Sequence, residues 1–445
     1  MNILYLPVET VKRELDSKLA IGLHALEFDQ FDEVIIGKDA ELFLCITEPG
    51  VILLKSAASF ESGLISRLKE FGHIVYSLDE EGIVPPLNDP SINSRFSKKN
   101  LDLLDGVLCN GPLELQSFPS WVRESDKIIM SGNPRFDFYK KENRAYYSKA
   151  VAKIRSEIGD KKVILIASRF GDVNIVEGQS CYEILSDNGF LDTEESKRFF
   201  SGFLEHSEKV FNSFLELPSL IADAFPECTI VVRPHPSESH EKWNEVSKRT
   251  NIIVRSDYDI GSWLACSECL IHNGCTTAIE ASVMQVPVLS YLPVKSLEFD
   301  LHHPNEIGYE INKADDLLIV VGNVLNYSEK YCGVRKLDSI LTYDMINPAS
   351  RLILNTLASK KPLRKIIKNK MCFKSFFSYY VKCVFKLILH CLGIRKEYKR
   401  AKYPFLFQRE YQERSKSIAK IFNLSVSYSL RKKGIDLISI KKKGK

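Results

Sequence analysis

The sequence lacks any apolar run of about 18 residues, the length that a helix needs to cross a bilayer. At the N-terminus, Glu9 interrupts the apolar stretch, and neither a basic region nor a small-residue cleavage site accompanies it, so we expect no signal peptide. The eleven cysteines are scattered and odd in number. Without a secretory signal, they predict reduced thiols in a cytosolic protein.

Common cofactor and metal motifs are missing too. No GxGxxG follows a predicted strand and no P-loop pattern occurs, which disfavours dinucleotide-binding and P-loop enzymes. Cys266 and Cys269 have no second pair at zinc spacing, so they predict core packing. The pair Asp257 and Asp259 could bind a metal, but Asp259 is better placed as the N-cap of a helix over Ile260–Ala265. We therefore expect neither a metal nor a cofactor.

Charge is distributed unevenly along the 445 residues. From Lys360 onward, 25 Lys/Arg face 4 Asp/Glu, whereas the preceding residues hold 36 basic and 53 acidic side chains. An acidic body with a basic tail indicates an anionic partner for the tail, either nucleic acid or an anionic membrane. Length and a hydrophobic content of 44% predict a globular protein of two or three domains.

Short, nearly continuous apolar runs alternate with helical patterns, which is typical of parallel sheets covered on both faces. Helices are expected between the strands, for example over Ala57–Phe71 and Leu113–Arg123, while Val173–Thr193 has no clear period and predicts a long loop. The predicted strands are Asn2–Val8, Glu33–Ile36, Val51–Leu54, Ile74–Leu78, Gly106–Cys109 and Lys127–Met130, then Val163–Ala167, Thr229–Arg233, Ile252–Arg255, Leu270–His272 and Val286–Tyr291.

The two series of strands predict two Rossmann-like domains that meet near residues 140–160. We expect residues 1–145 to form the first domain, residues 146–350 the second, and residues 351–445 a basic tail. Ligands of open α/β sheets bind beyond the carboxyl ends of the strands. Two such domains facing a cleft would hold the reactive groups between them.

The first candidate site follows the strand Thr229–Arg233. Pro234 and Pro236 restrict the backbone around His235, so a rigid loop presents one imidazole beyond the strand. The imidazole can donate to a phosphate oxygen, and Arg233 can add positive charge. Taken alone, the pattern also fits a structural histidine in a proline-bounded turn.

The second candidate site follows the strand that ends at His272. Gly274 permits a tight turn, and a helix begins near Thr276, whose free N–H groups and dipole would attract an anion. The hydroxyls of Thr276 and Thr277 can add donors, and Glu280 could accept from a ribose hydroxyl. The alternative is an ordinary capping box between Thr277 and Glu280.

The third candidate site lies in the first domain. Asp79, Glu80, Glu81 and Gly82 follow the strand Ile74–Leu78. Adjacent acids raise the pKa of at least one of them, and a carboxylate with a raised pKa is a good general base. A solvated acidic turn is the structural alternative.

Together these motifs resemble bacterial transferases of the GT-B fold that use CMP-activated sugars, including Kdo and nonulosonate transferases. More closely, the chain resembles the surface carbohydrate biosynthesis protein family over about residues 1–345. Gly132–Asp137 with Arg233–Pro236 is also similar to CDP-glycerol glycerophosphotransferases. The motifs that carry the family resemblance are Val8-Glu9 with Arg13-Glu14, Pro49–Lys55, Asp79–Gly82, Gly132–Asp137, Arg233–Pro236 and Gly274–Glu280.

The resemblance implies that His235, Thr276 and Thr277 bind the CMP phosphate and that Pro236 lines the nucleotide. It also implies that Glu80 or Glu81 is the catalytic carboxylate, acting as a base in an inverting enzyme or as a nucleophile in a retaining one. We favour Glu81, because Gly82 beside it allows close approach of the substrate. A monophosphate leaving group can be stabilised by a helix terminus and an imidazole without metal.

The tail contains a segment, Met371–Ile394, in which basic residues occupy one helical face and aromatic and aliphatic residues the rest. This pattern predicts a helix that lies in the interface of an anionic membrane. A helix packed on the body is the alternative. Nucleic-acid binding is disfavoured because no known reader module is present.

The sequence thus predicts a cytoplasmic glycosyltransferase, peripheral on the inner face of the cell membrane. Its expected donor is a CMP-activated ulosonic acid and its acceptor a surface polysaccharide or a lipid-linked glycan, as in capsule or O-antigen synthesis. A cytidine-nucleotide-dependent alditol-phosphate transferase is one alternative, and a noncatalytic membrane-docked assembly protein is another. A UDP-sugar epimerase would share the architecture but would leave Asp79–Gly82 unexplained.

Overall fold

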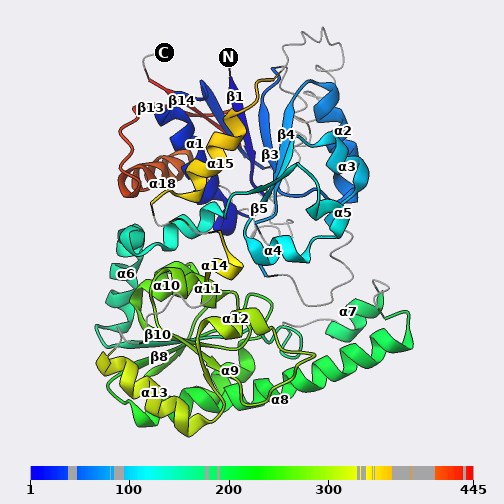
Figure 1. Ribbon diagram of the computed structural model, residues 1–445. Coiled ribbons are helices and arrows are strands. Elements are labelled where there is room, and N and C mark those ends of the chain that lie inside the picture. The colour runs from blue at the N-terminus through cyan, green and yellow to red at the C-terminus, as the bar shows by residue number, and fades with distance from the viewer. Residues whose placement is uncertain are drawn as a thin grey trace. The chain divides into compact units, whose positions relative to one another are not determined.

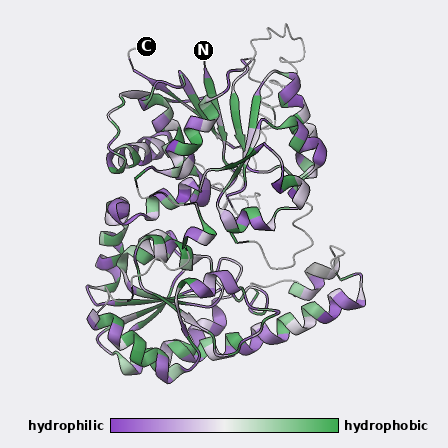
Figure 2. Ribbon diagram, viewed as in Figure 1, coloured by the Kyte–Doolittle hydropathy of each residue, from purple (hydrophilic) through white to green (hydrophobic). Residues whose placement is uncertain are grey.

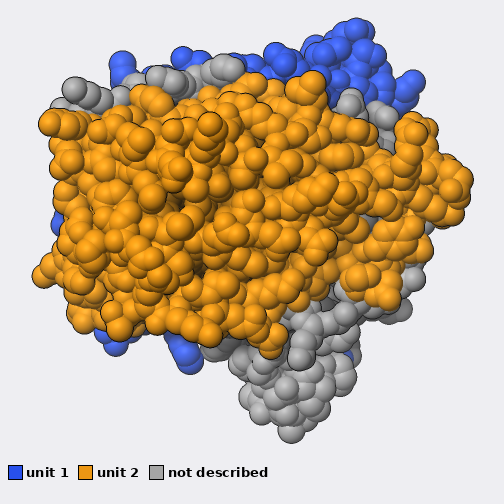
Figure 3. Space-filling view, turned by 90° about the horizontal axis from the view of Figure 1, so that it is seen from below, with its two compact units in different colours: residues 1–138, 338–445 blue, residues 139–337 orange. Residues whose placement is uncertain are grey.

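The computed structural model divides the chain into two compact units, coloured separately in Figure 3. Unit 1 comprises residues 1–138 and 338–445, and unit 2 comprises residues 139–337. The chain passes from unit 1 to unit 2 after residue 138, just before the predicted boundary range 140–160. It returns to unit 1 after residue 337, so the C-terminal segment belongs to the same unit as the N-terminal domain. The structure describes residues 2–38, 48–80, 82–84, 95–175, 180–187, 191–327, 331, 337–342, 344, 346–362, 381, 406–433 and 437–443.

Unit 1 is built on a mixed sheet whose described strands follow the order β13-β14-β2-β1-β3-β4-β5-β6. The strands from β2 to β6 run parallel, as the apolar runs predict, and most of their residues are buried. Figure 2 shows these strands as mainly hydrophobic. The strands are β1 (Ile3–Pro7), β2 (Glu33–Gly37), β3 (Val51–Leu54), β4 (Ile74–Leu78), β5 (Gly106–Cys109), β6 (Ile128–Met130), β13 (Tyr428–Lys432) and β14 (Leu437–Lys442).

Helices cover the sheet of unit 1 (Figure 1). The predicted helix Leu113–Arg123 is divided at Pro119 into two short helices, since proline lacks the N–H that a helix interior uses. The helical elements are η1 (Val11–Leu15), α1 (Asp16–Glu27), η3 (Ser59–Glu61), α2 (Ser62–Glu70), α3 (Lys98–Leu103), α4 (Pro112–Ser117), α5 (Ser120–Arg123), η5 (Pro134–Tyr139), α14 (Leu337–Ile340), α15 (Ala349–Ala358) and α18 (Gln408–Ile421).

The C-terminal part of the predicted tail is integrated into unit 1. Strand β14 pairs antiparallel with β2, and helix α18 packs against α1. Arg414 bonds Asp16 at 2.8 Å, and Ile438 and Ile440 are fully buried. Residues 406–443 are therefore part of the domain and do not form an appended tail. Of the predicted amphipathic helix Met371–Ile394, all but Val381 lies outside the described residues.

Unit 2 contains a parallel sheet with the strand order β12-β11-β10-β7-β8-β9. The order reverses between β7 and β10, which is the Rossmann arrangement and places a switch point between these two strands. The structure thus confirms the predicted α/β class with two Rossmann-like domains, as in GT-B-like proteins. The strands are β7 (Val163–Ala167), β8 (Thr229–Arg233), β9 (Ile252–Val254), β10 (Ser267–His272), β11 (Val288–Tyr291) and β12 (Tyr309–Ile311).

The helices of unit 2 enclose its sheet, and residues of the long helix α8 pack with β7 and β8 in one apolar cluster (Figure 1). Part of the predicted loop Val173–Thr193 is helical. Cys266 and Cys269 are buried, as predicted. The helical elements are η6 (Lys141–Tyr147), α6 (Ser148–Ile158), α7 (Cys181–Asp187), α8 (Glu194–Ala224), α9 (Glu241–Val246), α10 (Ile260–Cys266), α11 (Thr277–Val283), α12 (His302–Ile307) and α13 (Ala314–Tyr327).

Candidate functional site

In unit 2, three loops meet at the switch point of the sheet. They follow β7, β8 and β10, which are neighbours in the order β10-β7-β8 and end at the same edge. The predicted residues Arg233 and His235 lie at the end of β8, and Gly274 lies in the loop after β10. The fold therefore places both predicted phosphate-binding motifs at the same edge of the sheet, on either side of the loop after β7, where open α/β sheets bind ligands.

The loop after β8 exposes the ring of His235. Its Nδ1 atom accepts from the backbone N–H of Ser237 at 3.3 Å and lies 2.7 Å from the Ser237 hydroxyl oxygen. Because Nδ1 accepts, the neutral ring carries its proton on Nε2. An imidazole held in this tautomer can donate to a phosphate oxygen.

Glu238 anchors this loop, although the sequence did not single it out. Its carboxylate is 2% exposed and accepts from the backbone N–H of His235 at 3.0 Å. The same carboxylate accepts from the Ser168 hydroxyl at 2.6 Å, the Phe170 N–H at 3.0 Å and the indole N–H of Trp243 at 3.0 Å. One buried carboxylate thus fixes the loop after β8 to the loop after β7. An acid three residues beyond His235 was the available sequence signal.

The loops after β7 and β8 also touch directly. Asn174 donates its side-chain amide to the carbonyl of Ser239 at 2.8 Å, and the Ser239 N–H donates to the Asn174 carbonyl at 2.9 Å. A Cβ at Gly171 would lie only 2.1 Å from the Ser237 hydroxyl oxygen. A larger residue at position 171 would require Ser237 to shift, and together these contacts join the two loops into one platform.

Arg169 is a further basic residue on this platform that the sequence analysis missed. It lies two residues beyond the end of β7, and its Nε atom would lie 3.0 Å from a Cβ at Gly274. Gly274 has φ +58, a conformation that favours glycine. Arg169 lies close enough to the carboxyl group of Asp172 for its positive charge to lower the pKa of that acid, although burial raises it overall. A charged residue two positions beyond a buried strand was the sequence signal.

Arg233 offers a second guanidinium near the same edge. It bonds the carbonyl of Tyr258 at 3.5 Å, and its buried Nε atom has no hydrogen-bond partner among the residues that the structure covers. Arg169, Arg233 and His235 therefore supply basic groups at the ends of the adjacent strands β7 and β8. Two guanidiniums and an imidazole suit a phosphorylated ligand.

The turn at Gly274 and the start of helix α11 differ from both arrangements that the sequence suggested, a set of free N–H groups and a capping box. The Gly274 N–H already donates to the Asn305 side chain at 2.6 Å, and helix α11 has no side-chain cap hydrogen bond, so the predicted capping box does not form. Thr276 is exposed, whereas Thr277 and Glu280 are buried. The proposed ligand roles of Pro236, Thr276, Thr277 and Glu280 remain predictions.

His272 before this turn is a structural residue. Burial lowers its pKa to about 3, so it is neutral at physiological pH. Its Nε2 atom lies 3.0 Å from the Ser290 hydroxyl, and its Nδ1 atom accepts from the Cys275 N–H at 3.3 Å. The ring therefore ties the turn to β11.

Asp259 caps a helix, which is the arrangement that the sequence favoured over a metal site with Asp257. The Asp259 carboxylate accepts from the Ser262 N–H at 2.9 Å and caps α10, as predicted. Asp257 pairs with Arg255. Within the residues covered by the structure, no three His, Cys, Asp or Glu side chains form a group able to hold a metal.

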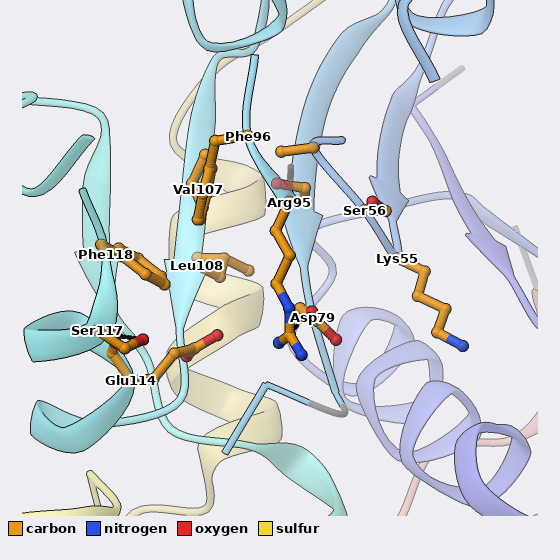
Figure 4. A pocket seen from close by; sticks show the side chains of 12 residues that line it. Lys55, Ser56, Asp79, Arg95, Phe96, Val107, Leu108, Glu114, Ser117 and Phe118 are labelled. Atoms are coloured by element: carbon orange, nitrogen blue, oxygen red, sulfur yellow. Dashed lines mark hydrogen bonds and ion pairs between the residues drawn. The ribbon is translucent and has the colours of Figure 1, made fainter. Parts of the chain in front are cut away.

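In unit 1, a small cavity lies beside the carboxyl ends of β4 and β5 (Figure 4). Asp79 reaches this cavity and pairs with Arg95 at 3.4 Å. The cavity is lined by Lys55, Ser56, Ala57, Ser77, Asp79, Arg95, Phe96, Val107, Leu108, Glu114, Ser117 and Phe118.

The neighbouring predicted acids are placed differently. Glu80 is 3% exposed and pairs with the buried ammonium of Lys18 at 2.8 Å, while Ser17 donates to its other oxygen at 3.3 Å. A carboxylate neutralised in this way is suited to holding α1 against the loop and poorly suited to attacking a substrate. Glu81 lies outside the described residues. Of these three acids, Asp79 is the one that the structure places at the cavity.

Glu114 is a second acid at the cavity that the sequence analysis did not select. It lies in the first turn of α4 and is 4% exposed. Burial, together with the charge of Asp79, raises its pKa to about 8. A glutamate in the first turn after a strand was the only sequence signal, and such residues are common helix caps.

A third group of charged side chains lies beyond the ends of β1 and β3, the two adjacent strands between which the strand order of the unit 1 sheet reverses. Lys55 pairs with Glu9 at 2.7 Å and with Glu14 at 3.7 Å. Burial and the nearby charge of Glu80 raise the pKa of Glu14 to about 7. This cluster anchors Lys55 at the rim of the cavity.

Comparison with known proteins gives one family match. Residues 95–295 match the family model described as CDP-Glycerol:Poly(glycerophosphate) glycerophosphotransferase. This range contains the whole platform of unit 2 and Glu114 of unit 1. It supports a transferase of bacterial surface-polymer biosynthesis and favours the predicted cytidine-nucleotide alternative, whereas the CMP-ulosonate donor receives no support. No curated protein matches the sequence.

Among solved structures, the chain is similar to a variant of the wall teichoic acid polymerase TagF, with 15% identity, a TM-score of 0.48 and coverage of 80% of this chain and 88% of that one. It is also similar to S. aureus MnaA bound to UDP (13%, 0.48, 81% and 99%). A putative UDP-N-acetylglucosamine 2-epimerase from Listeria monocytogenes gives comparable values (13%, 0.49, 80% and 96%).

Proposed function

We propose that the chain transfers an alditol phosphate from a cytidine diphosphate-activated donor to a hydroxyl group of a surface-polymer acceptor. The observation that carries the proposal is the basic platform at the switch point of unit 2. Arg169 and Arg233 can pair with phosphate oxygens, and His235 can donate from Nε2. The match to the glycerophosphotransferase family covers this platform and supports the cytidine nucleotide.

A diphosphate donor suits this arrangement on charge alone. A CDP-alditol presents two adjacent phosphates, whereas a CMP-activated sugar presents one, and the platform offers several basic groups. When the acceptor oxygen attacks the phosphorus that carries the alditol, CMP leaves with negative charge. Arg169 and His235 would stabilise that charge at the moment of transfer.

A binding experiment tests the nucleotide assignment. We would record thermal unfolding of the full chain with CMP, CDP, UMP and UDP at equal concentrations. A ligand at about 100 times its Kd stabilises the folded state by about 2.7 kcal/mol. We expect the cytidine nucleotides to raise the unfolding temperature and the uridine nucleotides to leave it unchanged. Stabilisation by UDP alone would contradict the proposal.

An activity experiment tests the donor class. The full chain is incubated with CDP-glycerol or with a CMP-activated ulosonic acid, in each case with a short glycerol-phosphate acceptor or a glycan acceptor. We expect CMP release and acceptor growth with CDP-glycerol. Transfer only from the CMP-ulosonate would reject the alditol-phosphate assignment and restore the glycosyltransferase prediction.

Membrane attachment remains a separate prediction. No helix in the described ranges is both long and apolar enough to cross a membrane. The basic segment Met371–Ile394 is the part of the sequence that predicts attachment to an anionic surface. We expect the full chain to bind anionic vesicles better than neutral vesicles, with high salt weakening the binding.

A further inference from the structure

A side chain from α12 holds the turn after β10 in unit 2. The backbone N–H of Gly274 donates to Oδ1 of Asn305 at 2.6 Å, and the N–H of Cys275 donates to Nδ1 of His272 at 3.3 Å. Helix α12, which carries Asn305, packs against α11, the helix that begins after this turn (Figure 1). These two backbone donors are therefore already paired with the chain's own side chains.

The amide of Asn305 leaves a different donor at the same turn. Because Gly274 presents an N–H, the oxygen of the amide faces it, and the other end of the group is the NH2. Asn305 is 5% exposed, and its buried Nδ2 atom has no hydrogen-bond partner among the residues that the structure describes. Buried amide groups are nearly always paired, so this exception points to a partner outside the chain.

Arg233 has an unpaired donor of the same kind. Its Nε atom, at the end of β8, is also buried without a partner in the described part of the chain. In the strand order β10-β7-β8, the turn held by Asn305 and the end of β8 lie on either side of the loop after β7. Both orphaned atoms are donors, so the partner that each lacks is an acceptor. An ionised phosphate offers acceptor oxygens in several directions.

Arg169 brings positive charge to the turn. A Cβ at Gly274 would lie 3.0 Å from the Nε atom of Arg169 and 3.1 Å from the Cβ atom of Leu301. A side chain at this position would therefore press on the guanidinium group. The amide of Asn305 and the guanidinium of Arg169 both lie against Gly274, and a neutral donor beside a cation is a suitable set for a phosphate.

We propose that Asn305 binds the nucleotide by donating from Nδ2 to a phosphate oxygen, beside Arg169. This inference rests on the proposed function, and it concerns residues of unit 2 alone. Asn305 then has two tasks. Its oxygen holds the Gly274 turn, and its NH2 group contacts the ligand.

The structural alternative is that Asn305 only holds the turn and that a buried water pairs with its NH2 group. Two substitutions separate the roles. Asn305→Asp keeps the size of the side chain and an oxygen for the Gly274 N–H, but it replaces the donor with a negative charge. Asn305→Ala removes both the oxygen and the donor and adds no charge.

The order of affinities therefore distinguishes the roles. If the NH2 group contacts phosphate, Asn305→Ala should bind CMP roughly 10- to 100-fold more weakly than wild type, as expected for a lost bond to a charged group. Asn305→Asp should bind still more weakly, because its charge repels the phosphate. If Asn305 only holds the turn, the order is reversed, and Asn305→Asp should bind CMP like wild type.

The experiment is calorimetric titration of the full chain with CMP, inorganic phosphate and cytidine. We expect CMP to bind wild type more tightly than phosphate does, and both variants to weaken CMP and phosphate while leaving cytidine unchanged. The matched control is Asn323→Asp, which makes the same charge change at an exposed position on α13 of the same unit. Thermal unfolding checks that each variant is folded. If Asn305→Asp does not fold, Asn305→Ala decides by its loss of CMP against its loss of cytidine.

The outcomes separate this proposal from the proposed function. If wild type binds CMP and transfers from CDP-glycerol while Asn305→Asp binds CMP normally, the role of Asn305 is rejected and the proposed function stands. A loss of cytidine binding equal to the loss of CMP binding would also reject the phosphate contact. If both variants lose CMP in the expected order but CDP-glycerol is no donor, the contact stands and the proposed function fails. If wild type binds neither CMP nor phosphate, both are rejected.

Discussion

The two units share a parallel-sheet architecture, but the groups that we assign to their sites carry opposite charges. At the switch edge of unit 2, Arg169, Arg233 and His235 gather basic groups on loops fixed by one buried carboxylate. At the corresponding edge of unit 1, Asp79 and Glu114 gather acids around a small cavity. Parallel sheets fix where a site lies, and the loop residues decide which chemistry it can perform.

Removing the C-terminal segment should have the largest effect and should act on unit 1. A chain cut after Lys360 loses the buried side chains of Tyr411, Ile418, Ile438 and Ile440. Each contributes about 1.5–3 kcal/mol by burial, so their sum rivals the stability of a whole domain. We expect insoluble protein, or loss of the unfolding transition of unit 1. A chain cut after Lys443 is the control, and an equally soluble, equally stable Lys360 cut would show that α18 and β14 are dispensable.

The second largest effect should be a pH dependence of stability that arises in unit 1. The pKa of Glu114 is about 8 in the folded chain and near 4.5 unfolded, so the folded state holds more protons between these values. The resulting stabilisation is complete below about pH 4.5 and is lost as the pH rises through 8. Glu114→Gln, which does not titrate, should therefore be more stable than wild type at pH 9.

The expected gain is a few kcal/mol at pH 9, since one pKa unit corresponds to about 1.4 kcal/mol. At pH 5 the variant and the wild type should unfold at similar temperatures. Chemical denaturation at the two pH values measures the difference, with Glu124→Gln as control. A variant less stable than wild type at pH 9 would contradict the raised pKa.

Nucleotide affinity should respond to changes in unit 2 and not to changes in unit 1. Arg169→Ala and His235→Ala each remove a group that we expect to contact phosphate. A charge-assisted hydrogen bond contributes about 1.5–3 kcal/mol, which corresponds to a loss of roughly 10- to 100-fold in CMP affinity. Lys55→Ala, a cation of unit 1, should leave the affinity unchanged. Calorimetric titration measures the affinity of each variant for CMP. Normal binding by both platform variants would show that CMP does not bind at this platform.

The smallest effect concerns the helix cap in unit 2. Asp259→Ala removes the acceptor for the Ser262 N–H at the start of α10, and losing an N-cap costs about 1 kcal/mol. Denaturant unfolding should show this loss in unit 2, with unit 1 unaffected. Asp257→Ala serves as the control because its ion pair with Arg255 lies at the surface. An equal loss in both variants would argue that the cap adds nothing specific.

The sequence predicted the parallel strands of both units except the short strand β12, because continuous apolar runs such as Val163–Ala167 have few other uses in a chain of this length. It missed β13 and β14. Both short strands contain lysine, so their sequences resemble the rest of the basic tail. The partner of β14, strand β2, lies hundreds of residues earlier in the chain, so the local sequence pattern does not indicate this pairing.

The candidate sites were predicted in part. His235 is exposed beyond β8, as its flanking prolines indicated, and Asp79 reaches a cavity. The burial of Glu80 could not be foreseen, because it depends on Lys18 from a distant helix. Arg169 and Glu114 were missed because each is a single charged residue after a strand. Their importance comes from Gly274 and Gly82, whose missing side chains leave room for them.

The pairing of β14 with β2 also determines when unit 1 can be completed during synthesis. Residues 33–37 leave the ribosome early, but their partner residues 437–441 are made almost last. Unit 2, made of residues 139–337, can finish folding first, while the edge of β2 stays open. An open edge strand can pair with other chains. We therefore expect nascent chains stalled before residue 437 to aggregate, and released full-length chains to remain in solution.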